Sequence, residues 1–285
     1  MLRKPDWLKV KLGGGDEFNK VKNILSSKGL HTVCEEANCP NLGECFCKGT
    51  ATFMILGDIC TRNCKYCNVK NGIPSHVNPH EPKNIAEAVK DLELKYVVIT
   101  SVTRDDLRDG GAMTFRKTID EIKKLTKAKV EVLTPDFKGD TDAIRKVLEA
   151  EPDVFAHNIE TVERLFHKVR PNANYRKSMI FLKRIKEIDP KQITKSGLMI
   201  GLGETKQEII KTMKELRLVK VDILTIGQYL QPRTDLTPVE KYYTPEEFEE
   251  FREIGNEMGF KFVMSGPLVR SSYHAAEGLN EIQID

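Results

Sequence analysis

The sequence predicts an α/β protein built as a partial (β/α)6 TIM-type barrel, with N-terminal and C-terminal extensions that close over the carboxyl rim of the strands. Six short apolar runs alternate with amphipathic helical segments between Thr52 and Met258, which is typical of βα units with a parallel sheet. Sequence motifs follow several of these strands, where parallel barrels place their chemistry. The expected parts are an N-terminal extension at 1–51, the barrel at 52–260, and a C-terminal strand and tail at 261–285.

The N-terminal extension is expected to hold one helix. Residues 1–15 are basic and rich in glycine, and they read as an extended arm. The helix that follows has Asp16 as its N-cap and Gly29 as the residue that stops it. The segment around the first cysteines is expected to be a loop, because asparagine, proline and glycine interrupt any regular period there.

The barrel segment reads as regularly spaced strands and helices. Its strands are predicted at 52–56, 96–100, 130–133, 154–157, 196–200 and 222–226. Its helices are predicted at about 84–93, 112–127, 140–150, 174–188, 206–219 and 246–258. The last helix has Thr244 as its N-cap and Pro245 at its first position. A further strand is expected at 262–264, before an irregular tail.

Composition limits the class of protein. With 285 residues, 40% of them apolar, the chain can bury the core of one large domain. The formal net charge of +3, from 45 basic and 42 acidic residues, argues against a nucleic-acid-binding protein. No apolar run approaches the roughly 18 residues that a membrane-spanning helix needs. The first residues lack an apolar leader, and seven cysteines fit a reducing compartment. We therefore expect a cytoplasmic protein.

The seven cysteines all fall within one short stretch and supply most of the predicted chemistry. Six of them form a first triplet, C-x4-C-x5-C, and a second triplet, C-x3-C-x2-C, which are Cys34, Cys39 and Cys45, and Cys60, Cys64 and Cys67. Thiolates are the preferred ligands of iron–sulfur clusters. Three thiolates are one too few for a closed zinc site, and an odd cysteine count disfavours disulfides. Zinc at both triplets, with histidines such as His31 as extra ligands, stays open as the mark of a zinc-stabilised binding or scaffold protein.

The chain resembles the lipoyl synthases, a family within the radical S-adenosylmethionine superfamily, over nearly all of its length. A C-x3-C-x2-C loop after a strand is the pattern of that superfamily. The motifs shared with the lipoyl synthases are Arg3–Lys9, Cys34–Asn41, Gly49–Gly57, Cys60–Cys64, Thr100–Leu107, His157–Val162, Gly227–Pro232 and Val269–Ala275. Other sulfur-inserting radical enzymes, of the biotin synthase or methylthiotransferase kind, are the alternative. Their auxiliary cysteines would lie elsewhere than just before the radical loop.

The resemblance implies two [4Fe–4S] clusters and S-adenosylmethionine as cofactors. The second triplet would hold the cluster whose open iron binds S-adenosylmethionine. The first triplet would hold an auxiliary cluster that supplies the inserted sulfurs and is consumed. A serine of the R-S-S-Y motif would be the fourth ligand of the auxiliary cluster, with Ser272 favoured and Ser271 the fallback. The family has a tryptophan where this chain has Phe46, and the adjacent Cys47 is interpreted as a spare thiol.

The resemblance also indicates cofactor contacts. Tyr66 occupies the position where the superfamily has an aromatic residue beside the adenine, although it fits equally well as a packing residue. The pair Gly110 and Gly111 resembles the glycine-rich contact with the methionine amino group. Asn158 and Glu160 are predicted to reach the ribose hydroxyls or the substrate, the alternative being a helix cap. Arg176 is a candidate partner for a carboxylate, the alternative being a residue of an exposed helix face.

The implied reaction is the insertion of sulfur at C6 and C8 of an octanoyl chain that is linked to a lysine of a lipoyl carrier domain. The expected partners are an octanoylated 2-oxoacid dehydrogenase E2 or glycine cleavage H protein, an electron donor such as flavodoxin or ferredoxin, and an iron–sulfur carrier protein. Neither nucleic acid nor membrane is an expected partner. Carrier domains are often acidic, so Lys4, Lys9 and Lys11 are predicted to raise the rate of encounter.

Overall fold

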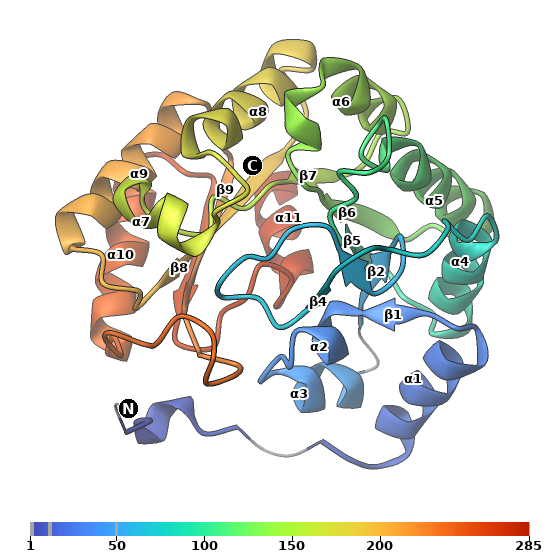
Figure 1. Ribbon diagram of the computed structural model, residues 1–285, viewed down its shortest axis with the longest axis horizontal. Coiled ribbons are helices and arrows are strands. Elements are labelled where there is room, and N and C mark those ends of the chain that lie inside the picture. The colour runs from blue at the N-terminus through green and yellow to red at the C-terminus, as the bar shows by residue number, and fades with distance from the viewer. Residues whose placement is uncertain (1–2, 11–12, 49–50, 285) are drawn as a thin grey trace. The chain divides into compact units, whose positions relative to one another are not determined.

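The structure, a computed structural model, describes residues 3–10, 13–48 and 51–284 (Figure 1). The chain forms two compact units. The N-terminal unit contains Val10–Arg62 and Asn68–Asp153, and the C-terminal unit contains Met1–Lys9, Asn63–Cys67 and Val154–Asp285. The second cysteine triplet is therefore divided, because Cys60 belongs to the N-terminal unit while Cys64 and Cys67 belong to the C-terminal unit.

The strands of the N-terminal unit follow the order β1-β2-β5-β6. β1 is antiparallel to β2, whereas β2, β5 and β6 are parallel to one another. These strands are β1 (His31–Thr32), β2 (Thr52–Ile55), β5 (Tyr96–Ser101) and β6 (Lys129–Leu133), and a separate parallel pair is β3 (Ile59–Cys60) and β4 (Lys70–Asn71). Every residue of β2 is buried, as expected for a parallel strand that is covered on both faces.

Helices cover the strands of the N-terminal unit. α4, α5 and α6 lie in a row along them (Figure 1), with α5 packed between the other two. The helices of this unit are α1 (Asp16–Ser27), α2 (Val33–Glu36), α3 (Leu42–Cys47), α4 (Glu81–Asp91), α5 (Ala112–Leu125) and α6 (Thr141–Leu148), with a 3-10 turn η2 (Phe137–Gly139). Ile85 in α4, Ile119 in α5 and Ile144 in α6 are almost fully buried, so burial of one apolar stripe per helix stabilises this layer.

The C-terminal unit has the same βα plan. Its strands follow the order β7-β8-β9-β10, and each neighbouring pair is parallel. The strands are β7 (Val154–Ala156), β8 (Thr194–Ile200), β9 (Ile223–Gln228) and β10 (Phe262–Gly266). The helices are η1 (Asp6–Leu8), α7 (Glu163–Val169), α8 (Tyr175–Ile188), α9 (Lys206–Leu218), α10 (Pro245–Glu257) and α11 (Ala275–Ile284). Leu198, Ile226 and Phe248 belong to one apolar core between the strands and these helices.

The predicted α/β fold with parallel strands is confirmed, and each predicted strand lies within two residues of its expected ends. Thr244 caps α10 as predicted, because its side chain accepts a hydrogen bond from the Glu247 backbone N–H (3.3 Å). The Glu247 carboxylate returns a bond to the Thr244 N–H (2.9 Å), which completes a capping box. Gly29 follows the end of α1 with φ +60°, a conformation that favours glycine. None of the helices described in either unit is long and apolar enough to cross a membrane.

Some local predictions are wrong. Asp16 is the first helical residue of α1, and Gly15 occupies the N-cap position; the Asp16 carboxylate still favours the positive end of the helix dipole. The first cysteine segment is not a loop but holds α2 and α3. Thr32 starts α2 by accepting the Glu35 N–H (3.3 Å). The tail, expected to be irregular, forms α11, and α7 was not predicted.

Candidate functional site

The first cysteine triplet gathers in the N-terminal unit. Cys34 lies in α2 and is only 5% exposed. The Cys39 backbone N–H donates to the Cys34 carbonyl (3.0 Å), and the Cys45 N–H donates to the Asn41 carbonyl (2.9 Å). Burial raises the pKa of Cys34 to about 12; hydrogen bonds with Thr52 oppose this, and the nearby charges of the other two cysteines add to it. Cys39 and Cys45 are therefore close enough to Cys34 to act on its charge.

The role of this donor set as a cluster site stays a prediction. Among the described residues, no three His, Cys, Asp or Glu side chains are grouped so that they could hold one metal ion. A four-iron cluster is larger than an ion, so its thiolate ligands stand further apart. Thiolates that repel one another are stabilised by the positive charge of bound iron. Cys47 is exposed, and its Sγ donates to the Gly14 carbonyl (3.3 Å); its interpretation as a spare thiol stays a prediction.

The second triplet is held by backbone hydrogen bonds in both units. In the N-terminal unit, Cys60 ends β3, and its Sγ accepts bonds from the backbone N–H groups of Arg62 (3.4 Å) and Thr103 (3.3 Å). In the C-terminal unit, the Cys67 N–H donates to the Cys64 carbonyl (3.1 Å). The backbone N–H of Lys65, which lies between them, donates to the carbonyl of Val169, the last residue of α7 (2.8 Å). All three cysteines are half-buried, which suits ligands of a cluster that a cofactor must reach.

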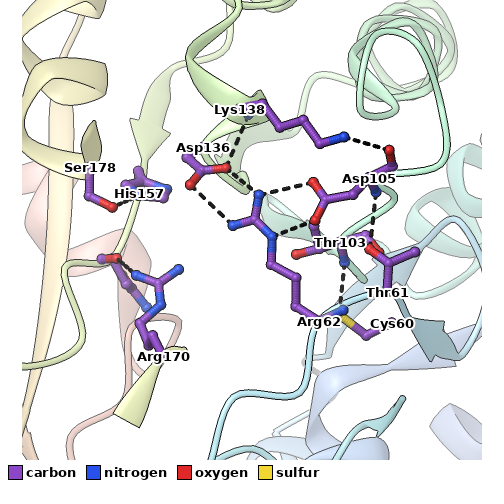
Figure 2. Close-up of polar contacts among 11 residues, drawn as sticks. Cys60, Thr61, Arg62, Thr103, Asp105, Asp136, Lys138, His157, Arg170 and Ser178 are labelled. Carbon is purple, nitrogen blue, oxygen red and sulfur yellow. Dashed lines mark hydrogen bonds and ion pairs between the residues drawn. The ribbon is translucent and has the colours of Figure 1, made fainter. Parts of the chain in front are cut away.

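Arg62 forms a two-sided ion pair in the N-terminal unit, which was not foreseen (Figure 2). Its Nε and Nη2 donate to the Asp105 carboxylate (2.7 and 2.9 Å). Its Nη2 and Nη1 donate to the Asp136 carboxylate (2.7 and 3.1 Å). Burial alone would lower the pKa of Arg62, but these bonds outweigh burial and raise it. Its place in the C-T-R-N-C motif was the available sequence signal, but the partners are 43 and 74 residues away.

Tyr66, Glu160 and Arg170 form a polar group in the C-terminal unit. Burial raises the pKa of Glu160, against the charge of Arg170 and hydrogen bonds from Asn158 and Tyr66. Burial and the Glu160 charge likewise raise the pKa of Tyr66. Glu160 has φ +69°, and its backbone is fixed on both sides by β8, through Gly197 and Met199 (both 2.9 Å). Non-glycine residues held in this conformation are enriched at functional sites.

The tail lies against β9 and Asn158 within the C-terminal unit. The Ser271 hydroxyl donates to the Asn158 side-chain oxygen (3.0 Å). Glycines make room for this contact: a Cβ at Gly227 would lie 2.1 Å from the Val269 carbonyl oxygen, and one at Gly197 would lie 2.7 Å from Asn158 Oδ1. Ser272 follows and is half-buried. The R-S-S-Y motif is therefore ordered against the same residue that contacts Glu160.

The other predicted cofactor residues have local partners. Gly110 and Gly111 precede α5 with φ +60° and +93°, and the Asp109 carboxylate accepts the Gly111 N–H (3.0 Å). Arg176 lies in the first turn of α8 with its side chain 84% exposed, paired with Glu163 (3.3 Å). Their predicted cofactor roles stay predictions. Lys11 and the motif residues at 49–50 lie outside the described residues.

His157, within a shared motif, is a buried structural residue. It is 1% exposed at the end of β7, and its Nε2 lies 3.1 Å from the Ser178 hydroxyl (Figure 2). Its ring packs against Phe181 at 4.9 Å between centroids. The buried ring therefore has both a polar partner and an aromatic neighbour.

The fold and the thiolate loop define the class of protein first. The family model of the radical SAM superfamily matches residues 54–216. The chain resembles the solved structures of methylornithine synthase (TM-score 0.57, 14% identity, 77% of this chain and 72% of that one) and of Streptococcus suis SuiB bound to S-adenosylmethionine (0.58, 13%, 79% and 54%). At such low identity these two structures support the fold alone. The chain is a radical SAM protein, and the superfamily implies a [4Fe–4S] cluster and S-adenosylmethionine.

The particular family follows from closer relatives. A model of the N-terminal domain of lipoyl synthase matches residues 1–39. Lipoyl synthase of Caldanaerobacter subterraneus subsp. tengcongensis is 56% identical over 98% of both chains. That of Idiomarina loihiensis is 56% identical over 96% of this chain and 87% of its own. This chain belongs to the lipoyl synthase family and is a sulfur-inserting enzyme.

Proposed function

We propose that this enzyme inserts sulfur at C6 and C8 of an octanoyl group carried on a lysine of a lipoyl domain, which gives the lipoyl group. The observation that carries the proposal is the gathering of Cys34, Cys39 and Cys45 around one buried thiol in the N-terminal unit. A single cluster would serve cofactor cleavage alone. A second thiolate set gives the chain a place for the sulfur that the reaction consumes.

Each triplet has its own task in this proposal. Cys60, Cys64 and Cys67 hold the cluster that binds S-adenosylmethionine. The first triplet and Ser272 hold the auxiliary cluster. When bound, the clusters and S-adenosylmethionine supply hydrogen abstraction from unactivated carbon, which no acid or base side chain can perform. The division into an N-terminal extension, a barrel and a tail, with boundaries at 51 and 260, is part of the same proposal.

The residues of the C-terminal unit bind and orient the cofactor. The Glu160 carboxylate accepts hydrogen bonds from ribose hydroxyls, and Arg170 offsets the cost of burying its charge. Tyr66 donates to Glu160 and places its ring beside the adenine. Asn158 fixes the backbone next to Glu160, because its carbonyl accepts a bond from Arg170 Nη1 (3.1 Å). Arg176 is a further candidate for the methionine end, and so are Gly110 and Gly111 of the N-terminal unit.

The partners follow from the reaction. The substrate is an octanoylated E2 or glycine cleavage H protein, flavodoxin or ferredoxin supplies electrons, and an iron–sulfur carrier rebuilds the auxiliary cluster. Lys4 and Lys9 increase the encounter rate with acidic carriers. Lys9 is exposed and pairs with Asp6 (2.6 Å), a contact that a carrier carboxylate can replace. Seven free thiols suit the reducing cytoplasm.

The test is anaerobic purification and reconstitution, followed by iron and sulfide counts and incubation with an octanoylated carrier domain. Two four-iron clusters predict about eight irons and about eight sulfides per chain. Lipoyl product should form only when S-adenosylmethionine and a reductant are present. Saturation near four irons would remove the auxiliary cluster from the proposal. A colourless, zinc-loaded protein without sulfide would favour the scaffold alternative.

A further inference from the structure

The Cys60 sulfur sits at the meeting point of two backbone donors and a buried ion pair. The donors are the N–H groups of Arg62 and Thr103, at 3.4 and 3.3 Å from Sγ. The Arg62 donor belongs to the loop that carries the second cysteine triplet, called the cysteine loop below. The Thr103 donor belongs to the loop after β5. Both can point at the sulfur only while these two loops keep their relative position. The N-terminal unit contains all of these residues.

The Arg62 side chain fixes that relative position. Its guanidinium spans Asp105, in the loop after β5, and Asp136, in the loop after β6, with two hydrogen bonds to each carboxylate. Lys138 links the same two loops again through its Nζ and the Asp105 carbonyl (2.8 Å), as Figure 2 shows. The side chain of Arg62 is only 5% exposed, so water competes little for these charge-assisted bonds.

Thr61 adds a second connection beside the sulfur. Its N–H and its hydroxyl both lie 2.9 Å from the Thr103 carbonyl, and its hydroxyl accepts the Asp105 N–H (3.0 Å). The loop after β5 is thus joined to the cysteine loop through three successive residues, Cys60, Thr61 and Arg62. Such over-determination is typical of groups that hold a ligand sulfur in one orientation.

We propose that Arg62 is a positioning residue that keeps both N–H donors on the Cys60 sulfur and so raises the reduction potential of the cluster that Cys60 carries. This inference rests on the proposed role of Cys60 as a cluster ligand. Reduction adds one electron from an external one-electron donor, without a bond being broken or a proton moved. Hydrogen bonds to cluster sulfurs stabilise the added negative charge, and they are one of the means by which proteins set the potential.

The experiment compares Arg62→Lys, Arg62→Gln and Arg104→Gln in the reconstituted holoenzyme. Lysine keeps the positive charge but cannot span two carboxylates. Arg104 is a matched control: it is similarly buried, and its guanidinium bonds go to Asp106 and to the Leu56 carbonyl. The first readout is a dithionite titration followed by the EPR signal that changes when S-adenosylmethionine is added. The second is the rate at which an iron chelator removes that cluster.

Positioning predicts a more negative midpoint potential and a several-fold faster iron loss in both Arg62 variants, with Arg104→Gln close to wild type. If Arg62→Lys keeps the wild-type midpoint potential while Arg62→Gln has a lower one, the positive charge alone explains the effect. That result would overturn the proposal. An equal shift in Arg104→Gln would also overturn it. If the reconstituted wild-type enzyme itself contains no cluster at Cys60, the proposed function is refuted instead.

A second pair of variants covers the case in which the Arg62 variants take up no cluster. Thr61→Val removes the hydroxyl that joins the two loops, whereas Thr61→Ser retains it. The proposal predicts a lower potential for Thr61→Val and a nearly unchanged one for Thr61→Ser. Equal potentials for Thr61→Val and wild type would overturn the proposal.

Discussion

The hydroxyl of Ser271 donates a hydrogen bond to the side-chain oxygen of Asn158, 3.0 Å away. These residues are 113 positions apart in the sequence, and the contact joins the tail to the group around Glu160. Asn158 also accepts a bond from Arg170 through its carbonyl. Ser271 therefore has a partner within the C-terminal unit, whereas the ligand role of Ser272 stays a prediction.

Replacement of Ser272 by alanine should separate cofactor cleavage from sulfur insertion. We expect near-normal cleavage of S-adenosylmethionine and a lipoyl yield lower by roughly tenfold or more, since lost support of a metal centre typically costs about 10–100-fold. Ser271→Ala should have a smaller effect because it loses only the bond to Asn158. Product is measured by mass spectrometry of the carrier. Normal yield from Ser272→Ala with inactive Ser271→Ala would transfer the ligand role to Ser271.

Substitutions in the two cysteine triplets should have different effects on cofactor cleavage and on lipoyl formation. Loss of Cys60, Cys64 or Cys67 should abolish cofactor cleavage, because the cofactor then has no open iron to bind. Loss of a cysteine of the first triplet should spare part of the cleavage but abolish lipoyl formation. Iron counts and the yield of cleaved cofactor measure the two effects.

Cys47→Ser is the matched control for the triplets. Its exposed thiol contacts the Gly14 carbonyl, so both activities and the full iron content should survive. Loss of the auxiliary cluster in this variant would make Cys47 a ligand. Equal loss of cleavage in both triplet sets, in well-folded protein, would contradict the separate roles.

Glu160→Gln should weaken S-adenosylmethionine binding by roughly tenfold, because hydrogen bonds to a charged acceptor contribute about 1.5–3 kcal/mol. Equilibrium binding to the reconstituted enzyme is the measurement. Arg176→Gln tests the other predicted contact; its exposed side chain pairs with Glu163, and any loss of affinity would place it at the cofactor. Unchanged binding in Glu160→Gln would remove Glu160 from the cofactor site.

Asp222→Asn should destabilise the C-terminal unit in a pH-dependent way. Burial by itself would raise the pKa of Asp222, but Lys186, the Thr194 N–H and Lys261 outweigh it and lower the pKa below 3.8. A lowered folded-state pKa means that the ionised form adds stability above pH 3.8, and that this is lost as pH falls through the folded-state pKa. Removing one partner of a buried pair costs about 3–5 kcal/mol.

Urea unfolding of the wild type and Asp222→Asn checks this. The gap between their free energies of unfolding should be full at pH 7 and should shrink below pH 4. Glu249→Gln is a suitable control, since the exposed Glu249 pairs with Arg252 on the surface of α10 and should change stability little. A gap that stays constant down to pH 2.5 would contradict the ionic explanation.

The sequence by itself determined the βα succession, the class of cofactor and the spacing of the two cysteine triplets. Strands such as 52–55 are continuous apolar runs, and cysteine spacing within one loop is local, so both can be predicted without a fold. The capping box at Thr244 and the stop at Gly29 are local for the same reason. The helices around Cys34 and Cys45 were missed because tertiary burial of Cys34 and Phe46 outweighed the weak helix propensity of their neighbours.

Only the tertiary structure decided which distant polar groups meet. Arg62 is paired with Asp105 and Asp136, and Asn158 with Ser271, across 43, 74 and 113 residues. No periodicity encodes such contacts, because they depend on which strand ends lie next to each other within a unit. The same applies to Gly227. The Val269 carbonyl approaches it so closely that no side chain would fit there. The chemistry of this chain was readable in its local motifs, and the orientation of the groups that support it came from packing.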